Sequence, residues 1–296
     1  MIPHRSLLLN WQNREAYWRL MRADKPIGIY LLLWPAVWGL LWAANGLPPW
    51  HIVLIFIGGV ILMRSAGCVI NDYADREVDE AVDRTNARPI VSGEVQPKEA
   101  LQLFLLLIAL SFILVLFLNK ATILLSFAAL FLASLYPFMK RFTHLPQVAL
   151  GAAFSWSIPM AFMAIMGELP LWLWLIYIAN LTWTVAYDTA YAMVDREDDL
   201  KVGVKSSAIL FGRFDISVIV LLEVTTISLL AYVGFITELH ASFYAGLAIA
   251  SAMFVYQFNL LKTRRREAYF KVFLHNHWVG LVIALGLLLG LLMRTS

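Results

Sequence analysis

The chain has 296 residues, of which 61% are hydrophobic and only 15% are charged. Its mean hydropathy of +0.73 excludes a water-soluble globular protein, because so few polar side chains cannot cover the surface of one core. We interpret the formal net charge of +3 as a membrane-topology signal and expect no nucleic-acid partner. The composition therefore predicts an integral membrane protein.

The N-terminal segment, residues 1–22, is charged and lacks the apolar core of a signal peptide. Leu7, Leu8, Trp11 and Trp18 are interspersed there with Arg and Glu, which is typical of a helix lying on the membrane surface. A disordered tail is the alternative. We expect an interfacial amphipathic segment over residues 1–22 and a membrane domain over residues 23–296.

The membrane domain contains nine apolar segments that are long enough to cross a bilayer. A hydrocarbon core about 30 Å thick needs roughly 20 apolar residues per helix, and these runs are too long and unalternating for barrel strands. The sequence predicts an all-α fold with nine transmembrane helices, centred on residues 26–44, 50–70, 100–118, 121–138, 147–166, 170–194, 216–236, 241–261 and 276–293.

The basic residues predict the orientation of these helices. If the N-terminus is cytoplasmic, every one of the 23 lysines and arginines except Lys120 and Arg294 falls on the cytoplasmic side. Cytoplasmic loops are enriched in Lys and Arg. We therefore expect the N-terminus and every long loop in the cytoplasm.

Two acidic stretches follow the second and the sixth predicted spans, which both run from outside to inside. Asn71, Asp75 and Asp79 are spaced i, i+4 and i+8, and Asp195 and Asp199 are spaced i and i+4, so each set lies on one helix face. Carboxylates together with substrate oxygens are the usual ligands of Mg²⁺. We call these two sets, Asn71–Asp75–Asp79 and Asp195–Asp199, the first and second acidic ladders. Together they predict a site for Mg²⁺ and a phosphate-bearing substrate on the cytoplasmic side.

Other acidic side chains near the ladders have a simpler explanation as solvated loop charges that nearby arginines balance. This explanation covers Asp72, Glu77, Glu80, Asp83 and Glu197.

The arrangement of an acidic ladder after a membrane span occurs twice in the chain. This repetition suggests a duplicated four-helix unit followed by a ninth helix.

Arg64 and Asp188 lie deeper in the same two helices, each about 10 Å of helix rise before Asn71 and Asp195. An ionisable residue at this depth faces the bundle interior or a wet cavity and is a functional candidate. The alternatives are an ion pair that ties the helices together, or an Arg64 that extends to the interface.

Basic residues at the cytoplasmic level can supply positive charge to the oxygens of a diphosphate. Ordinary topology-determining lysines and arginines also lie at this level. The candidates for direct phosphate binding are Lys140, Arg141 and Lys205, with Lys201 the weakest.

Several stretches are similar to the motifs of a known family. The strings "NDYADREVD" and "DREDD" resemble the NDxxDxxxD and DxxxD motifs of the UbiA superfamily of intramembrane prenyltransferases. Four further strings resemble, more narrowly, the 4-hydroxybenzoate polyprenyltransferases of ubiquinone biosynthesis: "RADKPIG", "RSAGCVINDYADR", "YPFMKRFTHLPQ" and "AYDTAYAMVDREDDLKVGVKSSAILFG". The similarity covers most of the chain.

The resemblance implies nine helices around a central cavity that opens sideways to lipid, with Mg²⁺ as cofactor and a polyprenyl diphosphate as donor. The enzyme would transfer the polyprenyl group to the ring carbon ortho to the hydroxyl of 4-hydroxybenzoate and release diphosphate. It would lie in the bacterial inner membrane with its active-site mouth facing the cytoplasm.

The resemblance also implies roles for individual residues. Arg64 is the candidate for binding the benzoate carboxylate, and Asp188 for polarising the phenol or accepting a proton. One Mg²⁺-diphosphate contact would be held by Asn71, Asp72 and Asp75, with Asp79 in support. The second contact would be held by Asp195 and Asp199.

Two alternatives are open. A UbiA-type enzyme that uses another aromatic acceptor would share the acidic motifs. An ion-coupled membrane transporter belongs to a different class, but transporter sites usually lie near the bilayer midplane on broken helices.

Overall fold

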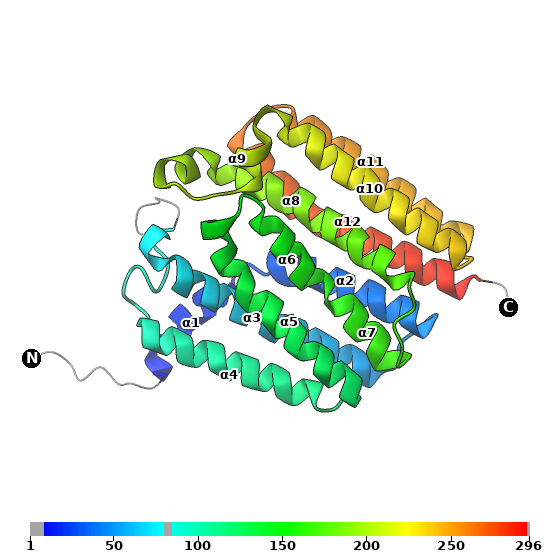
Figure 1. Ribbon diagram of the computed structural model, residues 1–296, viewed down its shortest axis with the longest axis horizontal. Coiled ribbons are helices and arrows are strands. Elements are labelled where there is room, and N and C mark those ends of the chain that lie inside the picture. Colours follow the sequence, from blue (N-terminus) through cyan, green and yellow to red (C-terminus); the bar gives the residue numbers. More distant parts are fainter. Residues whose placement is uncertain (1–8, 80–84, 295–296) are drawn as a thin grey trace, which may run out of the picture.

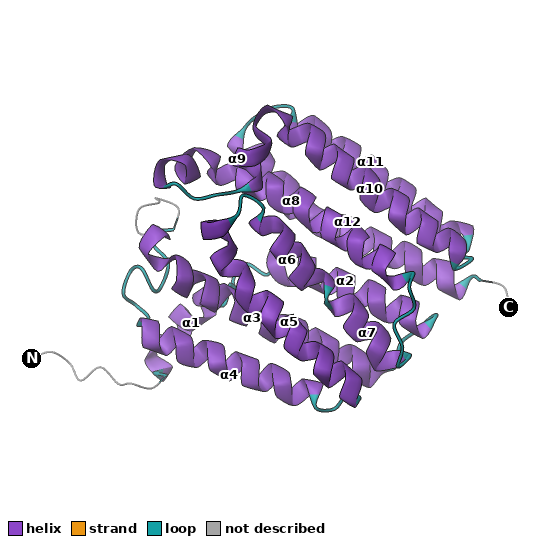
Figure 2. Cartoon of the chain, viewed as in Figure 1, coloured by secondary structure: helices purple, strands orange, loops and turns teal. Residues whose placement is uncertain are grey.

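The computed structural model describes residues 9–79 and 85–294, apart from the side chains of residues 78, 79 and 202. Within these ranges every regular element is a helix, and the long helices run side by side as a bundle (Figures 1 and 2). The elements are η1 (Trp11–Asn13), α1 (Arg14–Leu20), α2 (Ile27–Ala44), α3 (Trp50–Asp79), α4 (Pro97–Val115), α5 (Lys120–Phe142), α6 (Pro146–Ser155), α7 (Ser157–Ile165), α8 (Leu173–Val202), α9 (Ser207–Phe211), η2 (Gly212–Phe214), α10 (Asp215–Ile236), α11 (Ala241–Leu261) and α12 (Arg266–Leu292).

In the described part of the chain, eight helical segments are long and apolar enough to cross a membrane. They match eight of the nine predicted spans, so the prediction of an all-α integral membrane protein is confirmed. The remaining predicted span, 170–194, corresponds to the first part of α8, which begins at Leu173 and carries the buried polar residues Asn180, Thr184 and Thr189. Polar groups are tolerated there because they bond inside the bundle, as the Asn180 Nδ2 donor does to Ser155 Oγ at 2.8 Å.

The predicted span 147–166 forms two helices, α6 and α7, which meet at Trp156. Pro159 has no N–H to donate to the carbonyl of Ser155, one turn earlier, so the regular ladder of hydrogen bonds is interrupted at this point. The two short helices nevertheless follow one another and together fill one span.

α3 and α8 extend beyond their predicted spans, which end at residues 70 and 194. Each helix has 30 residues and is therefore about 45 Å long, more than the roughly 30 Å of a hydrocarbon core requires. α8 ends at Gly203, whose φ of 73° is the left-handed conformation that glycine adopts easily. Both acidic stretches are thus helical continuations of membrane spans. Residues spaced i and i+4 in them therefore lie on one helix face, as predicted.

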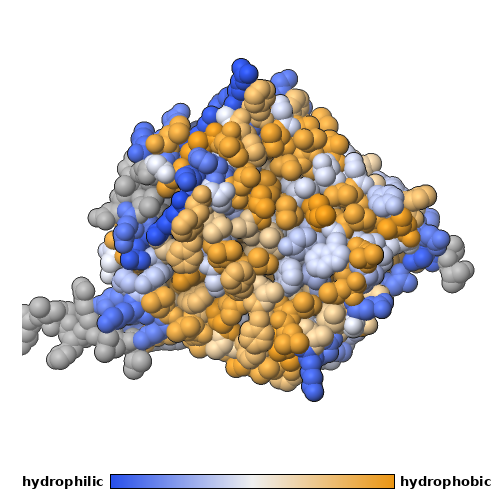
Figure 3. All heavy atoms as spheres, viewed as in Figure 1, coloured by the Kyte–Doolittle hydropathy of each residue, from blue (hydrophilic) through white to orange (hydrophobic). Residues whose placement is uncertain are grey.

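The largest core cluster lies between α2, α8, α12 and their neighbours. Trp38 and Trp183 stack there with ring centroids 5.2 Å apart, and Trp38 Nε1 donates to the carbonyl of Gly280 at 3.1 Å. A Cβ at Gly280 would stand 2.3 Å from Trp34, so only glycine lets the ring approach α12 this closely. On the visible outer face, hydrophobic side chains cover the middle and hydrophilic ones gather toward the edges (Figure 3).

α1 forms a short helix beside α3 and α4. It buries Ala16, Tyr17 and Leu20 in a second apolar cluster, whereas Trp11 and Trp18 are 80% and 55% exposed. Residues 1–8, which include Leu7 and Leu8, lie outside the described residues. The interfacial placement of the N-terminal segment and the division at residue 22 stay predictions, as does the internal duplication.

Candidate active site

A cavity of about 1760 Å³ runs along the bundle between α2, α3, α5, α8 and α12. Charged side chains line it where α3 and α8 end, and apolar side chains such as Leu118 and Phe127 line it near the opposite ends of α4 and α5. Ordinary ligand pockets have volumes of roughly 300–1000 Å³. The cavity is therefore larger than a small metabolite needs, and it offers one polar end and a long apolar remainder.

The first acidic ladder lies at the charged end, which we call the mouth. Asn71 Nδ2 donates to Asp75 Oδ2 at 3.2 Å, and Lys140 Nζ donates to the same oxygen at 3.0 Å. Arg141, next to Lys140 in the last turn of α5, donates from Nη2 to the carbonyl of Ala74 at 2.8 Å. Four of the predicted site residues are therefore close together, while the side chain of Asp79 lies outside the described ones.

The second ladder lines the same cavity from α8. Asp195 and Asp199 both face it, and Arg266 at the start of α12 approaches Asp195 Oδ1 at 3.6 Å. Lys205 also lines the mouth and reaches the carbonyl of Phe142 at 3.5 Å, whereas the exposed Lys201 pairs with Asp198. The tertiary structure thus brings the two ladders to one mouth, where Asn71, Asp195 and Asp199 line the cavity and Asp75 is bonded to the lining residues Asn71 and Lys140.

The side chains at the mouth suit a hard divalent cation. The Oδ1 atom of Asn71 is buried and has no hydrogen-bond partner in the structure, so it can accept a ligand. Among the described residues, no three His, Cys, Asp or Glu side chains are placed to hold a metal by themselves. Mg²⁺ is usually held by one or two carboxylates plus substrate phosphates, and this donor set fits that pattern.

Asp72 has different surroundings from the other acidic residues. Its side chain is 3% exposed, and it accepts from Arg22 Nη2 at 2.8 and 3.0 Å. Arg88 Nη1 lies 3.0 Å from its Oδ1. Both carboxylate oxygens are therefore engaged by arginines, and the predicted metal role of Asp72 gains no support from this geometry.

Arg64 lies deeper in the cavity, on α3. Its Nη1 donates to Cys68 Sγ at 2.8 Å, and its Nε is buried without a partner. The guanidinium packs against the first turn of α2, where a Cβ at Gly28 would stand 2.3 Å from Nε. Gly28 therefore leaves the space that Arg64 occupies.

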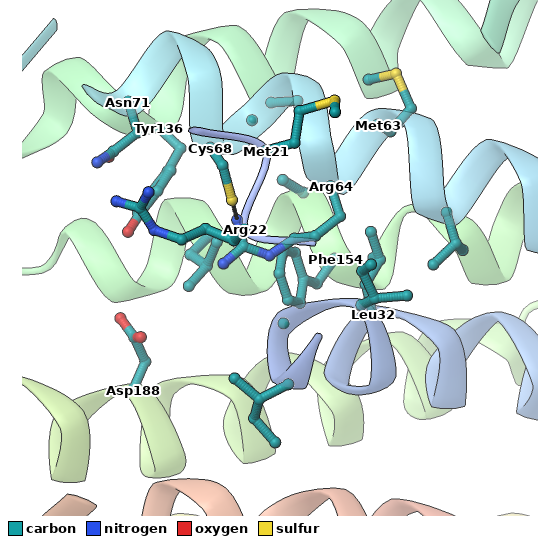
Figure 4. Close-up of a pocket in the computed structure, with 18 of the residues that line it drawn as sticks. Met21, Arg22, Leu32, Met63, Arg64, Cys68, Asn71, Tyr136, Phe154 and Asp188 are labelled. Carbon is teal, nitrogen blue, oxygen red and sulfur yellow. Dashed lines mark hydrogen bonds between the residues drawn. The ribbon is translucent and has the colours of Figure 1, made fainter. Parts of the chain in front are cut away.

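Asp188 faces the cavity from α8, on the side opposite Arg64 (Figure 4). Within the described part of the chain no ion pair joins Arg64 to Asp188. The structure therefore gives no support to the alternative in which an Arg64–Asp188 ion pair merely ties helices together. The two side chains leave between them a space with a cation on one wall and an acid on the other.

The cavity-lining residues that sequence analysis missed include Tyr136, Arg22 and Arg88. Tyr136 precedes Lys140 by four residues, so helical spacing places both on one face of α5, and this was the available signal. Arg22 and Arg88 come from segments whose positions relative to α3 follow only from the tertiary fold.

A bundle of membrane helices around an amphipathic cavity, with oxygen ligands and basic residues at its mouth, defines a membrane protein that binds an anionic, lipid-like molecule. The chain belongs to the UbiA prenyltransferase family, whose model matches residues 32–292. The resemblance in the sequence motifs is thereby confirmed over nearly the whole chain.

Relatives and solved structures agree with this assignment. The chain is 58% identical over 273 residues to a 4-hydroxybenzoate octaprenyltransferase of Pseudoalteromonas atlantica, covering 92% of this chain and 96% of that protein. It is 55% identical to the 4-hydroxybenzoate octaprenyltransferase of Vibrio parahaemolyticus, covering 94% and 98%.

The same fold is found in a UbiA homolog from Aeropyrum pernix K1, with a TM-score of 0.77, 24% identity, and coverage of 88% of this chain and 96% of that one. It is also found in a UbiA homolog from Archaeoglobus fulgidus bound to GPP and Mg²⁺, with a TM-score of 0.69, 21% identity, and coverage of 90% and 99%.

Proposed function

We propose that this chain transfers a polyprenyl group from a polyprenyl diphosphate to 4-hydroxybenzoate, in ubiquinone biosynthesis. The new bond joins the first carbon of the prenyl chain to the ring carbon ortho to the hydroxyl. The observation that carries the proposal is one cavity with two acidic ladders at its mouth and the partnerless Nε of Arg64 farther in. The names of the relatives specify an octaprenyl donor, and we propose the same donor here.

The donor set at the mouth would hold the diphosphate through Mg²⁺. Asn71 and Asp75 would provide one side of the site, and Asp195 and Asp199 the other. Asp79 is retained as a predicted ligand on its spacing alone. When bound, Mg²⁺ neutralises charge on the leaving diphosphate. The Mg²⁺ bound to the Archaeoglobus fulgidus homolog supports this choice of metal.

Basic side chains assist departure of the diphosphate. Lys140, which donates to Asp75, and Lys205 both line the mouth, so both can donate to diphosphate oxygens. Arg141 donates to the carbonyl of Ala74 and is not among the lining residues, so its phosphate contact stays a prediction. As the allylic C–O bond breaks, its electron pair goes to the diphosphate and positive charge develops on the prenyl carbon. Preorganised donors that face the developing charge favour this step.

Aromatic side chains and dry walls protect the resulting cation. Tyr191, Phe270 and Phe273 line the cavity, and the Tyr191 and Phe273 rings lie 4.6 Å apart. The faces of such rings attract cations. Exclusion of water by the apolar walls would prevent hydrolysis of the cation.

The acceptor would bind between Arg64 and Asp188. A guanidinium grips a carboxylate with two parallel hydrogen bonds, and the Nε of Arg64 has no protein partner. Asp188, on the opposite wall, would polarise the phenol or take the proton that leaves the ring when aromaticity returns. Bond formation at the ortho carbon and loss of this proton complete the reaction.

We further propose that the enzyme lies in the bacterial inner membrane with its N-terminus and cavity mouth in the cytoplasm. This orientation rests on the distribution of Lys and Arg between the two sides of the predicted spans. A cytoplasmic mouth would give the water-soluble acceptor direct access.

The two alternatives have different outcomes. An ion-coupled transporter is not supported, because the chain belongs to a prenyltransferase family and both ladders lie on unbroken helices. Another aromatic acceptor is a question of specificity. The identity of 55–58% to proteins named for 4-hydroxybenzoate favours that acceptor.

The test is an assay of the purified protein in lipid nanodiscs with octaprenyl diphosphate, Mg²⁺ and 4-hydroxybenzoate. We expect Mg²⁺-dependent formation of the ring-prenylated acid and release of diphosphate. A panel of other hydroxylated aromatic acceptors serves as the control for specificity. Turnover with another acceptor but none with 4-hydroxybenzoate would contradict the proposal.

A further inference from the structure

Asp72 and its two arginines join three segments of the chain around the cavity mouth. Arg22 comes from the turn before α2, Asp72 from α3, and Arg88 from the connection between α3 and α4. Asp72 is almost fully buried, while the side chains of Arg22 and Arg88 are 27% and 17% exposed and line the cavity. The ion pairs therefore hold two cations at the entrance.

The backbone at Arg22 is fixed by the end of α1, which this residue closes. Arg22 has a φ of 56°, a left-handed conformation that residues with a Cβ rarely adopt. A left-handed residue commonly closes the C-terminus of a helix. Here Ala23 N donates to the carbonyl of Trp18 at 3.1 Å and Arg22 N to the carbonyl of Arg19 at 3.0 Å, and Arg22 Nη1 donates to the same Arg19 carbonyl at 2.9 Å. The helix end therefore positions Arg22 where its side chain reaches Asp72.

The same region is joined together by further contacts. Arg19 of α1 forms an ion pair with Glu94 of the connection, and this pair holds the pKa of the Glu94 carboxyl below its usual range. Tyr17 and Asn13 donate to Glu99 at 3.4 Å, in the first turn of α4. α1 and the part of the connection after residue 84 thus form one layer, which we call the cap, and Asp72 ties it to α3.

Arg22 keeps donors for a ligand while Asp72 holds it in place. A guanidinium carries five N–H groups. Among the contacts of the described residues, Arg22 uses Nη2 for Asp72 and one Nη1 proton for Arg19. Its Nε and second Nη1 proton can therefore meet an anion in the cavity.

We propose that Asp72 is a positioning residue that fixes Arg22 and Arg88 at the cavity mouth, where the guanidinium of Arg22 binds the diphosphate of the donor. This inference rests on the proposed function for the identity of the anion. It assigns to Asp72 a role distinct from metal binding, although Asp72 directly follows Asn71. Without the negative charge at Asp72, the two cations repel one another and the cap loses its attachment to α3.

The first test is the steady-state kinetics of Asp72→Asn. We expect KM for octaprenyl diphosphate to rise at least about tenfold, because a buried charge pair loses one partner. We expect kcat to change much less, and the Mg²⁺ concentration for half-maximal rate to stay the same. Asp72→Glu restores the negative charge and is expected to recover most of the lost KM.

A second test needs no catalytic activity. Cys68 is the only cysteine, lines the cavity and is 5% exposed. If Asp72 secures the cap, a small anionic methanethiosulfonate reagent should modify Cys68 at least about tenfold faster in Asp72→Asn than in the unmodified protein. This measurement still reports on the cap if the proposed reaction is not observed.

Asp215 provides a matched control. It is fully buried and pairs with Arg264 at 2.7 Å and Arg196 at 3.4 Å. Of the described residues that line the cavity, none is Arg196 or Arg264. Asp215→Asn should therefore lower thermal stability without changing KM for the donor or the labelling rate of Cys68.

The outcomes are distinct. A higher Mg²⁺ requirement together with a collapse of kcat in Asp72→Asn would make Asp72 a metal ligand and overturn the proposal. An equal rise of KM for the donor in Asp215→Asn would mean that the rise in Asp72→Asn reflects lost stability, and this would overturn the proposal as well. Unchanged KM and unchanged Cys68 labelling in Asp72→Asn would do the same. Absence of prenyl transfer by the unmodified protein would instead contradict the proposed function, and the labelling result would still decide whether Asp72 secures the cap.

Discussion

Replacement of Arg64 tests the acceptor site most directly. Arg64→Lys keeps a positive charge but loses the planar pair of donors that matches a carboxylate. A hydrogen bond to a charged group contributes about 1.5–3 kcal/mol, so loss of one of the two bonds should weaken binding roughly 10- to 150-fold. Arg64→Leu removes both bonds, and the expected cost of about 2–5 kcal/mol corresponds to roughly 30-fold to several thousand-fold.

The assay measures KM for 4-hydroxybenzoate at saturating octaprenyl diphosphate, and KM for the donor at saturating acceptor. The donor value should change little, because Arg64 lies about 10 Å of helix rise from Asn71. 4-Hydroxybenzamide, which has the same shape without the negative charge, provides the complementary change in the substrate. The unmodified enzyme should prefer the acid, and Arg64→Leu should lose most of that preference.

Gly28→Ala perturbs the same guanidinium without removing it. The new Cβ would stand 2.3 Å from Arg64 Nε, so the guanidinium must move. We expect KM for 4-hydroxybenzoate to rise at least about tenfold, since displacement of a binding group by an ångström is costly. At Gly59 an added Cβ meets nothing within 4 Å, so Gly59→Ala is the matched control.

The reasoning about Arg64 would be refuted if Arg64→Lys raised KM for the donor and left KM for 4-hydroxybenzoate unchanged. Retained preference for the acid over the amide in Arg64→Leu would lead to the same conclusion. Thermal unfolding of each variant in nanodiscs shows whether a kinetic change reflects binding or lost folding.

Three further predictions concern the metal site and the topology. Asp75→Ala and Asp195→Ala should each abolish turnover in folded protein, and near-normal rates at saturating Mg²⁺ would remove the ladders from the mechanism. Chelation of divalent ions with EDTA should stop the reaction and added Mg²⁺ should restore it, whereas full activity in EDTA would contradict metal dependence. In a Cys68→Ser background, a cysteine near Lys98 should react only with reagent that reaches the cytoplasm and one near Gly46 only from outside, as measured by labelling of sealed vesicles; labelling of both from one side would exclude the predicted topology.

The amino-acid sequence by itself determined the class of fold. Bilayer thickness fixes the length of a spanning helix, and internal hydrogen bonding requires that helices or closed barrels do the spanning, so apolar runs are sufficient to predict an all-α bundle. The acidic ladders could also be predicted from the sequence, because residues four apart share a helix face. The motif strings around Asn71 and Asp195 indicated the family.

Only the tertiary structure decided which charges act together. Asp72 and Asp75 are three residues apart in one helix, yet Asp72 pairs with Arg22 and Arg88 while Asp75 pairs with Lys140. These partners come from segments distant in sequence, and sequence periodicity carries no information about which segment packs against which side of a helix. The same limit applies to Arg64, because its separation from Asp188 and its fit against α2 at Gly28 depend on how three helices pack together.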